Sequence, residues 1–122
     1  MRRSIIRFRP PIGIMLERLV SPVTQVEGVQ STTLFEPDGF VVFRSSEDQT
    51  NETPQMQRWV QALKEMDGEE RITLVMEGGT IILQRGKRLH FLVHCSARAN
   101  LGHIRQALDE CVQNLHNMER SN

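Results

Sequence analysis

The stretch Ser96–Met118, SARANLGHIRQALDECVQNLHNM, decides the fold of this 122-residue chain. Its apolar residues recur at alternating spacings of three and four, which is the period of one side of an α-helix. This stripe comprises Leu101, Ile104, Leu108, Cys111, Leu115 and Met118. Asn100 stands just before the stripe and suits an N-cap, because its side-chain oxygen can accept from a free backbone N–H. A helix with one apolar side must lie on an apolar surface, and the preceding sequence predicts a sheet.

Three β-rich runs precede this helix, at 71–77, 80–85 and 89–95. Gly78-Gly79 is a signal for a two-residue hairpin, and a second tight turn at 85–88 joins the last two runs. Links this short force neighbouring strands to be antiparallel.

The apolar patterns of these runs predict their places in the sheet. Ile81-Ile82-Leu83 and Phe91-Leu92-Val93 are apolar on both strand faces, which predicts interior strands covered from both sides. In the run 71–77, Ile72, Leu74 and Met76 alternate with their neighbours, which suits a strand near an edge. Because an apolar edge strand tends to pair with a strand of another chain, this run indicates a dimer.

The N-terminal half adds a helix and a hairpin. Apolar residues at helical spacing predict a helix over 11–21, and Pro22 is expected to end it. The turn residues Glu36-Pro37-Asp38-Gly39 separate two β-rich runs at 28–35 and 39–45. These runs therefore predict a hairpin of two strands.

A second helix is predicted over 53–66, with Thr53 as its cap and Pro54 as its first residue. Its apolar side comprises Met56, Trp59, Val60, Leu63 and Met66 or Asp67. Its other side comprises Gln55, Arg58, Gln61, Ala62 and Glu65. Because Trp, Met and Arg are enriched at interface centres, part of this helix is a candidate for contact with another protein. The alternative is that the helix only covers the core.

The element order α-β-β-α-β-β-β-α predicts an α+β fold, with a five-stranded, mostly antiparallel sheet and helices on both faces. A length of 122 residues fits one domain. We expect this domain over 11–118, after a basic arm at 1–10 and before a tail at 119–122.

Composition narrows the function classes. The formal net charge is zero, so the whole chain offers no basic field for nucleic acid. No apolar run approaches the ~20 residues of a membrane span, and the basic N-terminus lacks the apolar region of a secretory signal. Cys95 and Cys111 fall on segments expected in the core, which favours reduced thiols over a disulfide framework. We therefore expect a cytoplasmic protein without a stable membrane anchor.

The sequence offers no constellation for catalysis, a cofactor or a metal. His90 and His94 share a strand face, but a spacing of about 13 Å is too long for one ion. Cys95 has no identified base and Cys111 lies in the apolar stripe, so neither is predicted as a nucleophile. The polar run Ser45–Thr53 lacks the ligand pattern of a calcium loop. We therefore expect a protein that is not an enzyme and that needs no cofactor.

Three short motifs occur in the element order of a known family. They are Gly28-Val29 at the first strand, Asp38-Gly39 in the hairpin, and ANLGHIR at 99–105 opening the last helix. Over roughly 12–116 the chain resembles the roadblock (dynein light chain) family, in particular its bacterial regulators of small Ras-like GTPases. It departs from the usual pattern at Gln30–Thr33, where small residues are common, and in a shorter second helix that is less rich in alanine.

The resemblance implies a profilin-like sandwich that forms a homodimer or a related heterodimer. In this family the third strands pair across the dimer axis and the second helices lie side by side, which here points to 71–77 and 54–66. The implied dimer interface comprises Arg71, Ile72, Thr73, Leu74, Val75, Met76 and Glu77. The implied partner-binding residues are Gln55, Arg58, Trp59, Ala62 and Glu65.

The function implied by the resemblance is a non-catalytic dimeric adaptor or regulator of a small Ras-like GTPase. Such a protein can stimulate GTP hydrolysis by ordering the switch loops of the GTPase, without an arginine finger. Two alternatives stay open. The chain is a structural scaffold subunit with no GTPase partner, or it is a small-ligand sensor with a pocket between helix and sheet.

The arm at 1–10, MRRSIIRFRP, has two interpretations of its own. Its arginines interleave with Ile5, Ile6 and Phe8, which suits an arm that binds RNA or a membrane surface. The second interpretation is a solvated extension whose apolar residues dock on the domain, and the neutral charge of the whole chain favours it.

Overall fold

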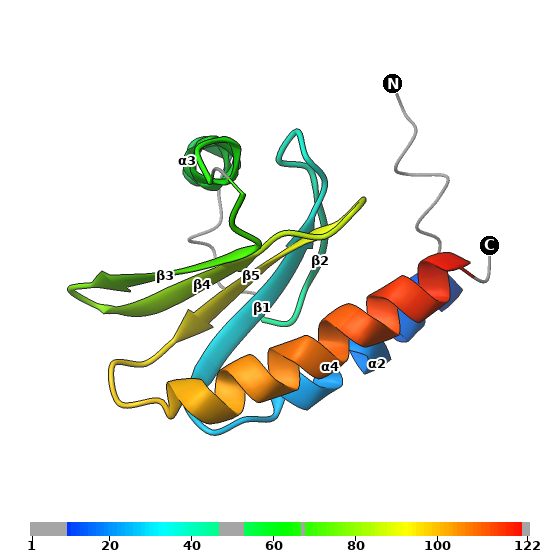
Figure 1. Ribbon diagram of the computed structural model, residues 1–122. Coiled ribbons are helices and arrows are strands. Elements are labelled where there is room, and N and C mark those ends of the chain that lie inside the picture. Colours follow the sequence, from blue (N-terminus) through cyan, green and yellow to red (C-terminus); the bar gives the residue numbers. More distant parts are fainter. Residues whose placement is uncertain (1–9, 47–52, 67, 121–122) are drawn as a thin grey trace.

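The elements of the chain follow the predicted order (Figure 1). The computed structural model describes residues 10–46, 53–66 and 68–120. The helices and strands are α2 (Pro10–Thr24), β1 (Val29–Phe35), β2 (Val41–Arg44), α3 (Thr53–Lys64), β3 (Arg71–Met76), β4 (Gly79–Gln84), β5 (His90–Cys95) and α4 (Leu101–Arg120). The α+β fold class is confirmed. Most of the arm and most of the polar run 45–53 lie outside the described residues.

The five strands form one sheet in the order β2-β1-β5-β4-β3. Every neighbouring pair is antiparallel. The predicted edge position of β3 is confirmed, and β2 forms the opposite edge. Helices α2 and α4 lie side by side on one face of the sheet and α3 lies on the other (Figure 1).

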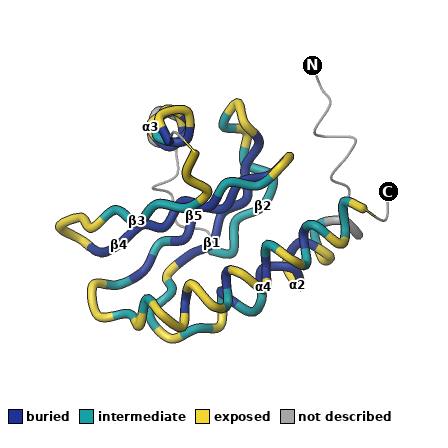
Figure 2. The backbone as a smooth tube through the Cα atoms, viewed as in Figure 1, coloured by how far each residue is buried: buried dark blue, intermediate teal, exposed yellow. Residues whose placement is uncertain are grey.

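The larger core lies between the sheet and the helices α2 and α4. Four residues of the predicted α4 stripe are buried in this core, namely Ile104, Leu108, Cys111 and Leu115. Helix α2 adds its own buried side chains to this layer, as the inward burial of both helices in Figure 2 shows; they are Leu16, Leu19, Val20 and Val23. Each fully buried aliphatic side chain contributes roughly 1.5–3 kcal/mol. The α4 stripe is therefore a major source of stability for this face.

Two of the motif segments meet at the start of α4. The Asn100 cap is confirmed, because its Oδ1 accepts from the backbone N–H of His103 at 3.1 Å. Gly28, just before β1, has a φ of +97°, and a Cβ there would come 2.7 Å from the Cβ of Ala99. The Ser96 N–H also donates to the Gly28 carbonyl at 2.8 Å. The glycine therefore allows the loop before α4 to lie against the start of β1.

Helix α2 does not stop at Pro22, and the predicted end at 21 is wrong. The helix continues to Thr24, and the N–H of Gln25 still donates to the carbonyl of Ser21 at 3.0 Å. A proline in the last turn removes only one helical hydrogen bond. Val23 is fully buried in the core, and its burial favours the extra turn.

The hairpin between β3 and β4 turns one residue earlier than predicted. Met76 pairs with Gly79, so the two-residue loop is Glu77-Gly78. Gly79 instead belongs to β4, where a Cβ would come 2.4 Å from the carbonyl oxygen of Cys95. Its function is therefore to let β4 approach β5 closely.

Candidate functional site: the β3 edge and the outer side of α3

Strand β3 presents an open edge. It pairs with β4 on one side, and no strand in the described part of the chain pairs with its other side. Val75 has 82% of its surface exposed and Met76 has 38% exposed. Unpaired backbone groups beside exposed apolar side chains are what a further strand would bind.

Contacts on both faces hold this edge strand in place. Ile72 and Leu74 pack against the core below α3. On the other face, Arg71 forms an ion pair with Asp109 of α4, and its Nε donates to Oε1 of Gln84 at 2.5 Å. Arg105 of α4 donates to the Thr73 hydroxyl at 3.2 Å. The edge is therefore anchored through residues 71–74, while its apolar end at Val75 stays exposed.

The outer side of α3 is polar and lies on the face of the sheet opposite to α4 (Figure 1). Its exposed residues are Gln57, Arg58, Gln61, Lys64 and Glu65. Gln61 Nε2 donates to Oε2 of Glu65 at 3.1 Å, one helical turn away. The helix therefore offers a charged, hydrogen-bonding surface on the same side of the sheet as Ile72 and Leu74.

Trp59 was predicted to contact a partner, but it does not lie on this exposed surface. Its side chain is only 2% exposed and packs in the core with Phe35, Leu83 and Leu92. The physical reason is the period of the helix, since Trp59 lies three and four residues from Met56 and Leu63 on the sheet-facing stripe. The Trp59 ring still contacts an exposed residue, because the Arg58 guanidinium lies 5.6 Å from the ring centroid.

The other predicted partner-binding residues divide into three groups. Arg58 and Glu65 are exposed and stay in the candidate surface. Ala62 is half-buried at the margin of the core. The side chain of Gln55 lies outside the described residues. Sequence reasoning missed Gln57 and Lys64, which the same helical period places on the exposed side.

Arg85 fixes the end of α3, and His90 fixes the turn that follows Arg85. Arg85 Nη2 donates to the carbonyls of Leu63 and Met66, at 2.5 and 3.2 Å. His90 Nδ1 accepts from the Gly86 N–H at 3.0 Å. Burial, and then the charge of Arg85, holds the pKa of His90 below its ordinary 6.5. The Arg85 guanidinium thus secures the end of the helix that carries the candidate surface, and the His90 ring holds the turn that follows Arg85.

Reactive side chains outside this surface are embedded in the core. Cys95 and Cys111 are free and buried, and burial raises the pKa of each thiol to about 11. No three His, Cys, Asp or Glu side chains of the described residues gather as a metal site. None of the described helices is long and apolar enough to cross a membrane.

Solved structures share this arrangement of elements, although the sequence matches no protein-family model and no curated protein sequence. MglB of Myxococcus xanthus superposes with a TM-score of 0.75 at 14% identity, covering 93% of this chain and 98% of that one. A roadblock/LC7 domain from Streptomyces avermitilis gives 0.69 at 14% identity, covering 85% and 97%. The chain has the roadblock fold. The resemblance predicted from three short motifs is thereby confirmed at the level of the fold.

The roadblock fold is also close to that of profilin. Profilin IB of Acanthamoeba castellanii superposes with a TM-score of 0.64 at 11% identity, covering 85% of this chain and 98% of that one. Proteins with different names thus share this architecture. The fold alone therefore does not identify a partner, which must be inferred from the exposed surface.

Proposed function

We propose that this chain is a non-catalytic adaptor that works as a dimer and binds a small Ras-like GTPase. The observation that carries the proposal is the open, apolar edge of β3 beside the charged outer side of α3, on a roadblock fold that spans nearly the whole chain. The dimer would pair β3 with the β3 of a second copy and bring two α3 helices together as one platform.

Arg58 and Glu65 supply the specific contacts in this proposal. Both are exposed and lie about two helical turns apart, Arg58 on α3 and Glu65 directly after it, so a pair of helices doubles the number of charges that face a partner. The buried Trp59 supports the position of Arg58 from below. The regulator would act by ordering the switch loops of the GTPase, since a bound surface can stabilise one conformation of a mobile segment.

The experiment is a pull-down from the native host with the tagged full chain, run in parallel with GDP and with a non-hydrolysable GTP analogue. Enrichment of a small GTPase in one nucleotide state only would support the proposal. Recovery of one complex that lacks a GTPase in both states would contradict it and favour the scaffold function instead.

A matched pair of variants then tests the surface. Arg58→Ala should weaken recovery of the GTPase, whereas Arg18→Ala should leave it unchanged. Both arginines are exposed on helices, but α2 and α3 lie on opposite faces of the sheet. Equal recovery with both variants would move the binding site away from α3.

A further inference from the structure

Basic side chains gather where helix α4 ends. A depression of about 210 Å³ opens to solvent between the turn after β4 and the last turns of α4. Lys87 and Arg88 of the turn and Arg120 of the helix line it, and all three are exposed. The acid among them, Glu119, is half-buried, and its Oε2 is buried. The outermost charges here are therefore positive, and we call Lys87, Arg88 and Arg120 the basic end.

The neighbouring charges do not reverse this balance. An adjoining depression shares Lys87 and Glu119 and adds Glu70 and Arg85, one acid and one base. His116, which lines both depressions, is half-buried. The formal charge of the residues around both depressions therefore stays positive with His116 neutral.

Helix α2 begins beside this end of α4 and exposes apolar side chains there (Figure 1). Ile14 is 57% exposed and Met15 is 46% exposed, and both lie within two turns of Pro10, the first residue of the helix. Exposed aliphatic side chains next to lysine and arginine are typical of a surface that lies on a bilayer.

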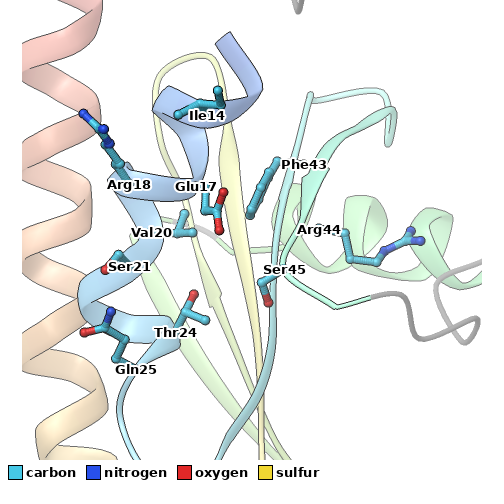
Figure 3. A pocket seen from close by; sticks show the side chains of 10 residues that line it. All are labelled: Ile14, Glu17, Arg18, Val20, Ser21, Thr24, Gln25, Phe43, Arg44 and Ser45. Carbon is cyan, nitrogen blue, oxygen red and sulfur yellow. The ribbon is translucent and has the colours of Figure 1, made fainter. Parts of the chain in front are cut away.

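A groove between α2 and β2 borders these apolar side chains (Figure 3). It has a volume of about 580 Å³, opens to solvent and has Ile14 and Phe43 among its walls. Glu17 points toward Phe43, whereas Arg18 points to the side of α2 that faces α4 (Figure 3). The acid in this part of α2 is therefore directed away from the helix that carries Arg120, and the arginine is directed toward it.

The sequence directly before α2 adds to the same charge. Residues 1–9, MRRSIIRFR, which lie outside the described residues, carry four arginines and no acid, with Ile5, Ile6 and Phe8 between them. The whole chain has 15 lysines and arginines and 15 acids, so the remainder of the chain has a net negative formal charge. Positive charge is thus concentrated in a segment that enters α2 beside the basic end.

We propose that the basic end, together with residues 1–9, binds reversibly to a membrane surface that contains anionic lipids. The lysine and arginine side chains would bind the anionic headgroups, and Ile14 and Met15 would contact the boundary between headgroups and acyl chains. The few apolar side chains available make this attachment reversible and not a stable anchor.

The exposed apolar side chains favour a bilayer over a nucleic acid as the anionic partner. Single-stranded nucleic acids bind on aromatic side chains, because their bases stack there. The exposed apolar side chains at the start of α2 are the aliphatic Ile14 and Met15, and residues 1–9 contain one aromatic residue, Phe8. Aliphatic side chains beside basic ones suit the interface of a bilayer instead.

Attachment by the basic end would leave the outer side of α3 free. Helix α3 lies on the face of the sheet opposite to α2 and α4 (Figure 1). A bound chain could therefore hold a GTPase at the membrane. This consequence rests on the function proposed above, whereas the attachment itself does not.

The test is co-sedimentation of the full chain with vesicles of phosphatidylcholine, alone or with about 30% phosphatidylserine. The wild type should bind the anionic vesicles at least about tenfold more tightly than the neutral ones. This binding should weaken at least about tenfold when the salt concentration rises from about 0.05 M to about 0.5 M, because salt screens exposed charges.

A matched pair of variants tests the position of the surface. Arg88→Glu should weaken binding to the anionic vesicles at least about tenfold, because it reverses a charge at the basic end. Arg98→Glu makes the same change of charge at an exposed residue just before α4, at the opposite end of that helix, and should change binding by less than about twofold. Arg7→Glu should weaken binding in the same direction as Arg88→Glu.

Three results would overturn the proposal. The first is equal binding to neutral and anionic vesicles, or none to either. The second is an equal effect of Arg88→Glu and Arg98→Glu, which would assign no role to the basic end. The third is binding to polyuridylic acid without binding to anionic vesicles at the same salt concentration, which would assign this end to a nucleic acid. None of these results depends on whether the chain binds a GTPase.

Discussion

At the scale of single residues, Arg58 and Trp59 are neighbours in sequence with opposite environments. The Trp59 ring fills the core below α3, while the Arg58 guanidinium lies over the ring from outside. A substitution at one position should therefore change stability, and a substitution at the other should change recognition.

We predict that Trp59→Ala lowers the free energy of unfolding by about 3–5 kcal/mol, because it leaves a cavity between α3 and the sheet. Arg58→Ala should change it by less than about 0.5 kcal/mol, as is usual for exposed positions. Chemical denaturation of both variants measures the difference. Equal losses in the two variants would mean that Trp59 is not a core residue.

His90 links the stability of the chain to pH. In the folded chain, burial and Arg85 hold the pKa of His90 below 6.5. Below pH 6.5 the unfolded chain binds a proton that the folded chain resists, so the free energy of unfolding falls as pH drops toward the folded pKa. Above pH 6.5 both states are neutral at this position and the effect is absent.

We predict that His90→Gln reduces the dependence of the unfolding free energy on pH between about pH 7.5 and pH 5. The variant can still accept from the Gly86 N–H but does not titrate in this range. His103→Gln, at an exposed position of α4, is the control and should keep the wild-type slope. If the unfolding free energy of His90→Gln kept the wild-type dependence on pH, His90 would not be the source of that dependence.

At the scale of elements, the end of α3 depends on a residue of another segment. Arg85 follows β4 directly and donates to two carbonyls at the end of α3. Helix ends carry carbonyls without helical partners, so a guanidinium there satisfies groups that would otherwise be left unpaired.

Arg85→Met keeps much of the apolar stem and removes the donors, so we predict a loss of about 1–3 kcal/mol in the free energy of unfolding. Removal of the positive charge should also raise the pKa of His90, as measured by NMR titration. Lys87→Met, two residues away and exposed, is the control and should change neither quantity. No change in Arg85→Met would show that the cap does not stabilise α3.

The sequence predicted which helices and strands form more accurately than it predicted where they end or what packs against them. Periodicity alone was enough to place α4 and to make β3 an edge strand, because those patterns depend on burial. Local stop and turn signals failed at Pro22, where the burial of Val23 outweighs the stop signal, and at Gly79, whose role depends on the close approach of β5. Such tertiary effects leave no local pattern.

The candidate site was predictable only in part. The outer side of α3 and the apolar β3 follow from helical and strand periods. The assignment of Trp59 to the surface relied on composition at interfaces, although its own spacing placed it on the core stripe. The groove between α2 and β2 arises from the packing of segments distant in sequence, so no motif could have indicated it.

At the scale of the whole molecule, the two sheet edges differ. The β2 edge faces a groove beside α2, and the β3 edge ends in exposed Val75 and Met76. If β3 pairs with its copy about a two-fold axis, each chain presents the same residues to the other. A charge placed at Val75 is then present on both sides of the interface.

The most direct measurement is the mass of the full chain in solution, by sedimentation equilibrium, for the wild type, Val75→Asp and Met15→Asp. We predict twice the chain mass of 14.1 kDa for the wild type and for Met15→Asp, whose exposed site lies on α2. Val75→Asp should raise the dimer dissociation constant at least about tenfold, because each chain would bring a charge into an apolar edge-to-edge interface. A wild type that stays at 14.1 kDa, or a dimer that Val75→Asp leaves intact, would contradict assembly through the β3 edge.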